Sequence, residues 1–315
     1  MSKKRLLQTS TNDLSAANVK PAMKHSTLAV IALIVVTLVW GGGFPGLYFV
    51  SRIPTFHVNA IRFTGSAIIL ALVFRKRLKV INRDYIKLGI VTGIFMFLTY
   101  ACATMAIHYT TASRTAFFSC LSAPCVPVLV FLFFRQKPTR RNIVSLLICA
   151  VGVYLISMSG QDGNVGMNIG DILSLCASAF TAMEIVLIDR YLGDKDSTVL
   201  SILELGAIGI FSIIAIFVSG EQSPASWTSG EIWAMIYLTL GCTALAFVLK
   251  TFGQKHVPAG RASIILTMEP VFGGIDSAIL LNDKLGLRGW IGALIVVASV
   301  IISEYHADSK DESNF

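Results

Sequence analysis

The chain has 315 residues, of which 54% are hydrophobic and 14% are charged, and its mean hydropathy is +0.71. Soluble domains carry about 25% charged residues, so this composition excludes an ordinary soluble protein and indicates a membrane protein. The formal net charge of +8 does not indicate a nucleic-acid partner, because the cations lie in short segments between apolar runs.

Ten apolar segments predict membrane spans, each of which takes about 20 mostly apolar residues. Charges, Gly or Pro bound every segment: 27–49, 56–74, 86–107, 112–134, 142–159, 170–189, 198–218, 231–251, 258–281 and 287–305. The first apolar run is longer than the core of a signal peptide, so we expect an uncleaved span after a tail of residues 1–26. The connecting loops are too short to hold a soluble catalytic domain.

The distribution of Lys and Arg predicts the orientation of these spans. With the N-terminus in the cytoplasm, 21 of the 26 cations face inside, four face outside, and Arg62 lies within a span. Cytoplasmic loops are enriched in Lys and Arg. We therefore expect residues 1–26 and 306–315 to form cytoplasmic tails of a multi-pass protein of the cell inner membrane.

The two halves of the chain carry weak copies of one pattern. Residues 108–156 align with residues 255–303 at a constant offset of 147, and seven of the 49 positions are identical. One matched pair is Arg114 with Arg261, which fall at the same point relative to the same apolar spans. Each stands near a helix start, and we expect the pair to anchor opposite ends of the protein.

The spans and the repeat together predict an all-α integral membrane fold of ten transmembrane helices. The first repeat would cover residues 27–159 and the second residues 170–305. Because each repeat holds five spans, the second would enter the membrane inverted. Inverted repeats are typical of secondary transporters, whose substrate path lies between the halves near the middle of the membrane.

The first span ends in an unusual segment, Trp40-Gly-Gly-Gly-Phe-Pro-Gly46. Four Gly and one Pro within seven residues weaken a helix. Two interpretations are open. The segment is either a loosely wound helix end that lines the substrate path, or a packing motif whose small residues let neighbouring helices approach closely.

Arg62 is the one cation that the sequence places well inside a span. A charge at the middle of the bilayer costs on the order of 2.5 to 3.5 kcal/mol, so we expect Arg62 to face the bundle interior or a partner. It either binds a substrate carboxylate or neutralises one of the intramembrane acids.

Four acids lie away from the ends of the predicted spans of the second half. We interpret Glu269 and Glu184 as candidates for binding a proton or a cationic part of a substrate, and Glu204 as a packing or pairing group near the inner face. Pro270 follows Glu269 and predicts a kink that frees a carbonyl, so Glu269 is alternatively a structural anchor. Asp276 lies on the same helix face as Glu269 and either extends a line of carboxylates or is solvated near the outer surface.

Aromatic residues in the spans are candidates for lining a central cavity, with packing or lipid contact as the alternative. The cavity candidates are Trp40, Phe44, Tyr100, Phe180 and Pro270. The six Cys lie inside apolar runs without metal-ligand spacing, which favours small buried hydrophobic residues. We expect no metal, no cofactor and no ATP hydrolysis, because the sequence has no phosphate loop, zinc pattern or haem pattern.

Five segments together resemble the drug/metabolite transporter superfamily, specifically its ten-span EamA branch. The segments are Trp40-Gly-Gly-Gly-Phe44, Asn59-Ala-Ile-Arg62-Phe63, Tyr109-Thr-Thr-Ala-Ser-Arg114, Val257-Pro-Ala-Gly-Arg261-Ala-Ser263 and Met268-Glu269-Pro270-Val271-Phe272. The resemblance implies a secondary carrier with two EamA repeats, commonly an exporter of amino acids, metabolites or drugs. The first half has Ser122-Ala123 where the second has Glu269-Pro270, so an acidic function at this point would be one-sided.

We therefore expect a transporter, not an enzyme, that exports small organic solutes by alternating access, with proton coupling through Glu269 or Glu184. The expected partners are a small-molecule substrate and the lipid bilayer, and the sequence does not indicate an oligomeric state. The alternatives are an uncoupled facilitator of the same solutes, a channel, and a polytopic membrane enzyme, which would need paired carboxylates or a His cluster facing the lipid head groups.

Overall fold

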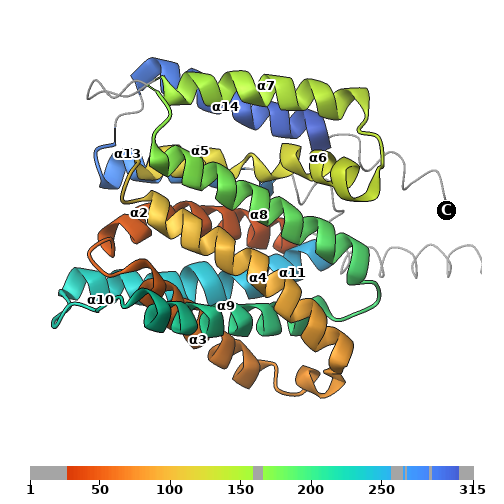
Figure 1. The fold of residues 1–315 in the computed structure, drawn as a ribbon, viewed down its shortest axis with the longest axis vertical. Coiled ribbons are helices and arrows are strands. Elements are labelled where there is room, and N and C mark those ends of the chain that lie inside the picture. Colours follow the sequence, from red (N-terminus) through yellow and green to blue (C-terminus); the bar gives the residue numbers. More distant parts are fainter. Residues whose placement is uncertain (1–26, 159–165, 257–264, 267, 284–285, 305–315) are drawn as a thin grey trace, which may run out of the picture.

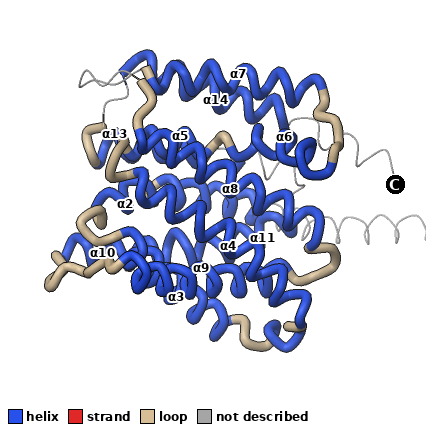
Figure 2. Tube along the Cα trace, in the orientation of Figure 1, coloured by secondary structure: helices blue, strands red, loops and turns tan. Residues whose placement is uncertain are grey.

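A computed structural model of the chain describes residues 27–158, 166–256, 265–266, 268–283 and 286–304, which are helical and contain no strand. The first helix spans Thr27–Phe49, and its last part is α2. The elements are α2 (Gly43–Phe49), α3 (Thr55–Val73), η1 (Arg77–Val80), α4 (Arg83–Ala106), α5 (Ala112–Ser119), α6 (Ser122–Phe134), α7 (Arg140–Ser157), α8 (Ile169–Tyr191), α9 (Ser197–Ser219), α10 (Ser229–Ile236), η2 (Tyr237–Leu245), α11 (Ala246–His256), α13 (Glu269–Leu280) and α14 (Gly286–Glu304). The long helices lie side by side in stacked layers, with α7 and α14 on one outer side and α3, α9 and α10 on the other (Figure 1, Figure 2).

Six of the described helices are long and apolar enough to cross a membrane. They are Thr27–Phe49, Thr55–Val73, Arg83–Ala106, Ile169–Ile188, Ser197–Ser219 and Ser229–Lys250. The bent pair of α5 and α6 makes a seventh if it forms one span, and α7 and α14 hold shorter apolar helices. The prediction of an all-helical membrane fold is confirmed, whereas the number of ten spans stays a prediction. The tails 1–26 and 306–315, the segment 258–264 of the ninth expected span and Arg261 within it lie outside the described residues.

Polar side chains set the starts of the long helices. Each accepts a hydrogen bond from a backbone N–H of the first turn that would otherwise lack a partner. The capping residues are Asn82, Thr111, Thr139, Asn168, Asp196 and Thr228. At the other end of α9, Gly220 takes a left-handed conformation with a φ of 69° and ends the helix. The helix ends therefore lie at polar segments that flank the apolar runs.

The expected spans that the repeat would relate contain helices that pack against each other. Helix α3 packs on α9, α5 packs on α13, and α7 packs on α14. Helix α4 packs on both α8 and α9. The core therefore contains helices from both halves of the chain.

Two helices begin at positions that share the offset of the repeat. Helices α5 and α6 are separated by a break, and their axes differ by 49°. The offset of 147 residues separates Ser122, the first residue of α6, from Glu269, the first residue of α13. Pro270 therefore stands in the first turn of α13, where its missing N–H loses no intrahelical bond. The predicted kink at Pro270 stays a prediction, because residues 257–264 and 267, which precede this helix, lie outside the described part of the chain.

The glycine-rich end of the first span stays helical and packs closely. The N–H of Gly42 donates to the carbonyl of Leu38 at 3.1 Å, and the N–H of Gly46 donates to the carbonyl of Gly42 at 3.0 Å. A Cβ atom on Gly41 would lie only 2.8 Å from the backbone nitrogen of Gly273 in α13. Of the two interpretations of this segment, the structure supports close packing.

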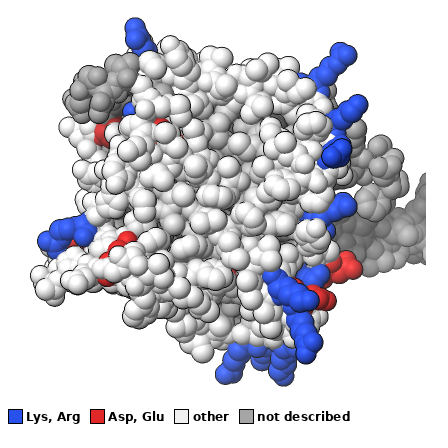
Figure 3. All heavy atoms as spheres, in the orientation of Figure 1, with Lys and Arg blue, Asp and Glu red and all other residues white. Residues whose placement is uncertain are grey.

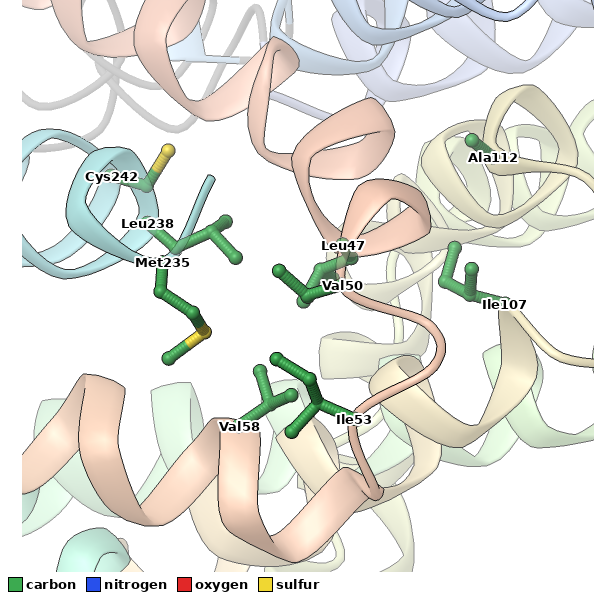
Figure 4. Packing of buried hydrophobic residues seen from close by; sticks show 9 residues of the cluster. All are labelled: Leu47, Val50, Ile53, Val58, Ile107, Ala112, Met235, Leu238 and Cys242. Atoms are coloured by element: carbon green, nitrogen blue, oxygen red, sulfur yellow. The ribbon is translucent and has the colours of Figure 1, made fainter. Parts of the chain in front are cut away.

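An apolar core closes one end of the fold around α2 (Figure 4). Met235 and Leu238 from the α10–η2 helix point toward Leu47 of α2 and Val50, which follows it (Figure 4). The other members of this core are Ile53, Val58, Ile107, Ala112 and Cys242. Its residues come from both halves of the chain, so the cluster joins the halves at this end.

The surface has the charge distribution of a membrane protein. Lys and Arg gather toward the edges of the face in Figure 3, and its middle carries few charges. Large apolar side chains are exposed along the helices, among them Leu72, Leu132, Phe217, Val218, Ile279 and Leu294. Such a surface suits lipid, because burial of these side chains in hydrocarbon removes them from water.

Candidate functional site

Charged and aromatic side chains from six helices interact inside the bundle. We call this group the central cluster: Arg62 of α3, Tyr100 of α4, Glu184 of α8, Glu204 of α9, Lys250 of α11 and Glu269 of α13. Tyr100 interacts electrostatically with Arg62 and with all three acids. The cluster thus combines two cations and three acids from both halves of the chain.

Arg62 is held by three neighbours deep within the bundle. Its Nε–H donates to Oγ1 of Thr243 at 2.7 Å, and its guanidinium carbon lies 5.0 Å and 5.2 Å from the ring centroids of Phe63 and Tyr100. Only 6% of its surface is exposed. At a rise of 1.5 Å per residue, Arg62 lies roughly 10 Å along α3 from its start at Thr55. A cation at this depth needs such partners.

Glu269 is the acid of the cluster that lies in the first turn of α13. The positive end of the helix dipole favours a carboxylate at this position. Both Arg62 and Lys250 attract the Glu269 carboxylate. Its side chain is half-buried, whereas Arg62 and Glu204 are almost fully buried. Of the three acids in the cluster, Glu269 is therefore the one that interacts with both cations and is also partly exposed.

Lys250 is a second cation within the bundle, and we did not expect it from the sequence. Its Nζ lies 5.4 Å from the ring centroid of Trp40 and 5.9 Å from that of Phe247. The same ammonium group attracts Glu184 and Glu269 as well as Glu204. Lys250 ends the apolar span Ser229–Lys250, so in the sequence it resembles the cations beyond it, which we predict to face the cytoplasm.

Glu184 and Glu204 interact side chain to side chain between α8 and α9. Glu184 is half-buried, and Glu204 is 4% exposed. We predicted from the sequence that Glu204 packs or pairs near the inner face. The structure pairs it with Glu184, which we had selected as a candidate for binding a proton or a cationic part of a substrate. The two carboxyl groups form the acidic side of the cluster.

The π-helix η2 presents backbone carbonyls to the neighbouring helices. Trp40 Nε1–H donates to the carbonyl of Cys242 at 2.7 Å, and the Ser66 hydroxyl of α3 donates to the carbonyl of Thr239 at 2.8 Å. The hydroxyl of Thr243 donates to the carbonyl of Leu238, five residues earlier, at 2.9 Å. π-Helical turns often occur at functional sites. In this protein the turn places Thr243 and Trp40 beside the two cations.

The other residues selected from the sequence lie outside the central cluster. Asp276 is half-buried near Tyr237, and no interaction with Arg62 or Lys250 is described for it. Phe44 packs at Gly273 of α13 and against the apolar core around α2. The ring of Phe180 lies 6.5 Å from that of Phe95, between α8 and α4. Pro270 is buried beside Glu269.

Arg114 has a structural pairing at the end of the bundle that we predict to face outward. Its Nη2 donates to Oδ2 of Asp171 at 2.5 Å and to the carbonyl of Gly166 at 3.1 Å. Asp171 is fully buried and also accepts bonds from the Thr110 hydroxyl at 3.0 Å and the Asn168 N–H at 3.1 Å. This agrees with the anchoring role expected for Arg114.

Side chains that could bind a metal do not gather in the described part of the chain. No group of three or more His, Cys, Asp and Glu there could hold a metal ion. Each of the six Cys is a free thiol.

Sequence comparison relates both halves of the chain to one family of transporters. The EamA-like transporter family matches residues 27–158 and residues 168–305. An uncharacterized transporter of Archaeoglobus fulgidus is 30% identical over 275 residues, which cover 87% of this chain and 85% of the relative. The uncharacterized transporter YetK of Bacillus subtilis is 26% identical over 82% of this chain and 81% of its own length. The uncharacterized inner membrane transporter YicL of Salmonella typhimurium is 23% identical over 63% of this chain and 66% of its own length.

A solved crystal structure of another protein has the same fold. It superimposes with a TM-score of 0.63 and covers 90% of this chain and 98% of its own. Only 14% of the aligned residues are identical, so this likeness concerns the fold alone.

Proposed function

Since this chain belongs to the EamA-like transporter family and is a multi-span membrane transporter, we propose that it exports a small organic solute by alternating access, driven by proton entry. We further propose the topology expected from the sequence: ten spans in two inverted repeats, with both termini in the cytoplasm. The name of the Salmonella relative supports placement in an inner membrane. The matched starts of α6 and α13 support the inverted repeat.

The observation that carries this proposal is the central cluster. Arg62, Lys250 and Glu269 bring charges of both signs to one place inside a lipid-facing bundle, and they come from different halves of the chain. Intramembrane charges are costly, so such groups commonly mark a substrate or ion path. A polar solute with ionised groups would find partners of both signs here, and Trp40 and Tyr100 add aromatic surfaces.

Helix breaks at this depth support the same proposal. Broken helices in transporters direct their half-helix N-termini at charged groups of the substrate. Helix α13 begins at Glu269, and the matched helix α6 begins at Ser122. We propose that these two starts flank the path and that Glu269 exchanges a cationic part of the solute for a proton.

Contacts between the halves close the proposed outer end in this conformation. Arg52 donates to Glu231 at 2.9 Å and 3.1 Å, and the N–H of Ser113 donates to Asp283 at 3.1 Å. In the alternating-access scheme these bonds break when the outer end opens. Arg52 is more than half exposed, so water can replace part of its bond to Glu231 and the cost of opening stays modest.

Growth assays followed by flux measurements test the proposal. A deletion strain and a strain expressing the protein are grown against a panel of toxic amino acids, metabolites and drugs, and the compound with the largest difference is carried into proteoliposomes. We expect saturable flux that responds to an imposed pH gradient and falls in Glu269→Gln. Flux that ignores the gradient while Glu269→Gln transports normally would exclude proton coupling and leave a facilitator. Single-channel currents would instead indicate a channel.

A further inference from the structure

The interior of the bundle holds one acid whose partners are incomplete. Glu204 is 4% exposed, and among the described residues its Oε1 atom has no hydrogen-bond donor. Helices α4 and α9 approach closely on both sides of it. A Cβ on Gly89 would lie 2.7 Å from Leu203, and one on Gly93 would lie 3.4 Å from the carbonyl of Glu204. The carboxyl group is therefore enclosed by protein and kept away from bulk water.

The neighbours of Glu204 do not supply a full set of donors. Thr92 on α4 is within hydrogen-bonding reach of Glu204, but its single hydroxyl hydrogen is also within reach of the carbonyl of Leu88 at 3.0 Å, so it serves two acceptors. Arg62 on α3 directs its Nε–H to Thr243. Lys250 on α11 attracts Glu204 but also attracts Glu184 and Glu269, so one ammonium group serves three acids.

Another acid, Glu184 of α8, interacts with Glu204 both through its charge and side chain to side chain. Tyr100 on α4 is the remaining titratable group that interacts with both. Two ionised carboxylates offer only acceptors and repel each other. A hydrogen bond between them requires a proton on one of the two, and that proton would also satisfy part of the buried acceptor capacity of Glu204.

We propose that Glu184 and Glu204 form a proton-binding pair that holds one proton between the two carboxyl groups. Uptake forms one O–H bond and gives the pair a charge of −1, and release to the opposite side breaks that bond and gives −2. Lys250 balances the charge that appears on release. Glu184 is the half-buried member and exchanges the proton with the path, whereas Glu204 is the enclosed member that retains it.

The use of this pair in transport rests on the proposed function, but the presence of the shared proton does not. Under that function the pair would be the site where the driving proton enters, and Glu269 would remain the group that exchanges a proton for the solute. Removal of a pair member would then abolish the response to a pH gradient while leaving solute binding at Glu269 in place.

Infrared difference spectroscopy across a pH titration tests the pair directly, with protons as the only ligand. The purified full-length protein in lipid nanodiscs is compared with Glu184→Gln, Glu204→Gln and the double variant. We expect a protonated-carboxyl band of the pair in the wild type that is lost in each single variant, with no further loss in the double variant. Glu221→Gln is the matched control and keeps this band, because Glu221 lies outside the central cluster and accepts from the N–H of Phe56.

Two results would overturn the proposal. If Glu184→Gln and Glu204→Gln each remove a separate band and the double variant removes the sum, the carboxyls titrate independently. If the band is insensitive to pH but changes on addition of Na⁺ or Li⁺, the pair binds a metal cation.

A further variant guards against misfolding of the glutamine variants. Lys250→Met keeps both carboxyls, and we expect its band to persist to higher pH because the cation that favours ionisation is gone. A Lys250→Met band that titrates as in the wild type would contradict the charge balance.

The spectra also separate this proposal from the proposed function. A shared proton together with flux that ignores the pH gradient would refute proton-driven export but keep the pair. Gradient-driven flux without a shared band would refute the pair alone.

Discussion

Replacement of Arg62 by Met tests whether the central cluster holds the bundle together. The change keeps a long side chain but removes the cation, the Nε–H bond to Thr243 and the contacts with two aromatic rings. A hydrogen bond to a charged group contributes about 1.5 to 3 kcal/mol. Breaking an isolated buried charge pair costs about 3 to 5 kcal/mol, but Glu269 is half-buried and keeps Lys250 as a second cation, so less is lost here. We therefore expect a loss of about 2 to 3 kcal/mol in the free energy of unfolding.

The conservative variant and a surface control define the origin of this loss. Arg62→Lys keeps the charge near Glu269 but loses the planar Nε–H donor, so we expect a loss of roughly 1 to 3 kcal/mol. Arg52→Met removes an arginine whose side chain is 59% exposed, and exposed pairs contribute about 0 to 1 kcal/mol. The order Arg62→Met, Arg62→Lys, Arg52→Met should therefore run from the largest loss to the smallest.

Equilibrium unfolding of the purified variants in mixed micelles measures these differences. The double variant Arg62→Met with Glu269→Gln removes both charges, and we expect its loss to be smaller than the sum of the single losses by about 1 to 3 kcal/mol. An Arg62→Met loss within about 1 kcal/mol of the wild type, or strict additivity in the double variant, would refute the argument that Arg62 compensates the buried acid.

Three further changes are measured in the same unfolding assay. Gly41→Ala should cost about 1 to 3 kcal/mol, since its Cβ would lie 2.8 Å from α13, whereas Gly206→Ala meets no atom within 4 Å and should stabilise by up to about 1 kcal/mol; equal effects would contradict the close packing. Asp171→Ala should cost more than Arg114→Met, because Asp171 also accepts bonds from two other donors; the reverse order would refute that reasoning. Trp40→Phe should lose about 1 kcal/mol with the Nε1–H bond to η2, and an unchanged stability would show that this carbonyl finds another donor.

The positions of the helices could be predicted from the sequence because apolar runs and charged loops set them. The expected segments 198–218 and 170–189 lie within one or two residues of α9 and α8. The break in the fourth expected span could not be predicted in the same way. Apolar content is continuous from α5 into α6, and Pro124 and Pro127 lie within α6 instead of at the break.

The central cluster was predicted in part. Glu269, Glu184 and Arg62 stood out because each is a charge inside an apolar run. Lys250 was missed because it lies near the end of its span, where the next cations belong to the predicted cytoplasmic side. Its role depends on the direction of its side chain toward Trp40 and the acids, which no pattern in one helix reveals.

Asp276 was selected from the sequence but lies outside the central cluster. Its spacing of two helical turns from Glu269 placed it on the same face, and this geometry holds within one helix. Tyr237 and Gly42 surround it instead of Arg62 or Lys250, because a helix face of two turns meets different neighbours along its length.

Solute flux in proteoliposomes tests the central claim that the cluster around Arg62 and Glu269 is the substrate path. The solute is the compound identified by the growth panel, and Glu221→Gln, at the end of the bundle, is the control. We predict saturable flux in the wild type and in Glu221→Gln, and a loss of about tenfold or more in Glu269→Gln, equivalent to about 1.4 kcal/mol. Folded Glu269→Gln and Arg62→Lys proteins that both transport at the wild-type rate would contradict the claim and place the path elsewhere in the bundle.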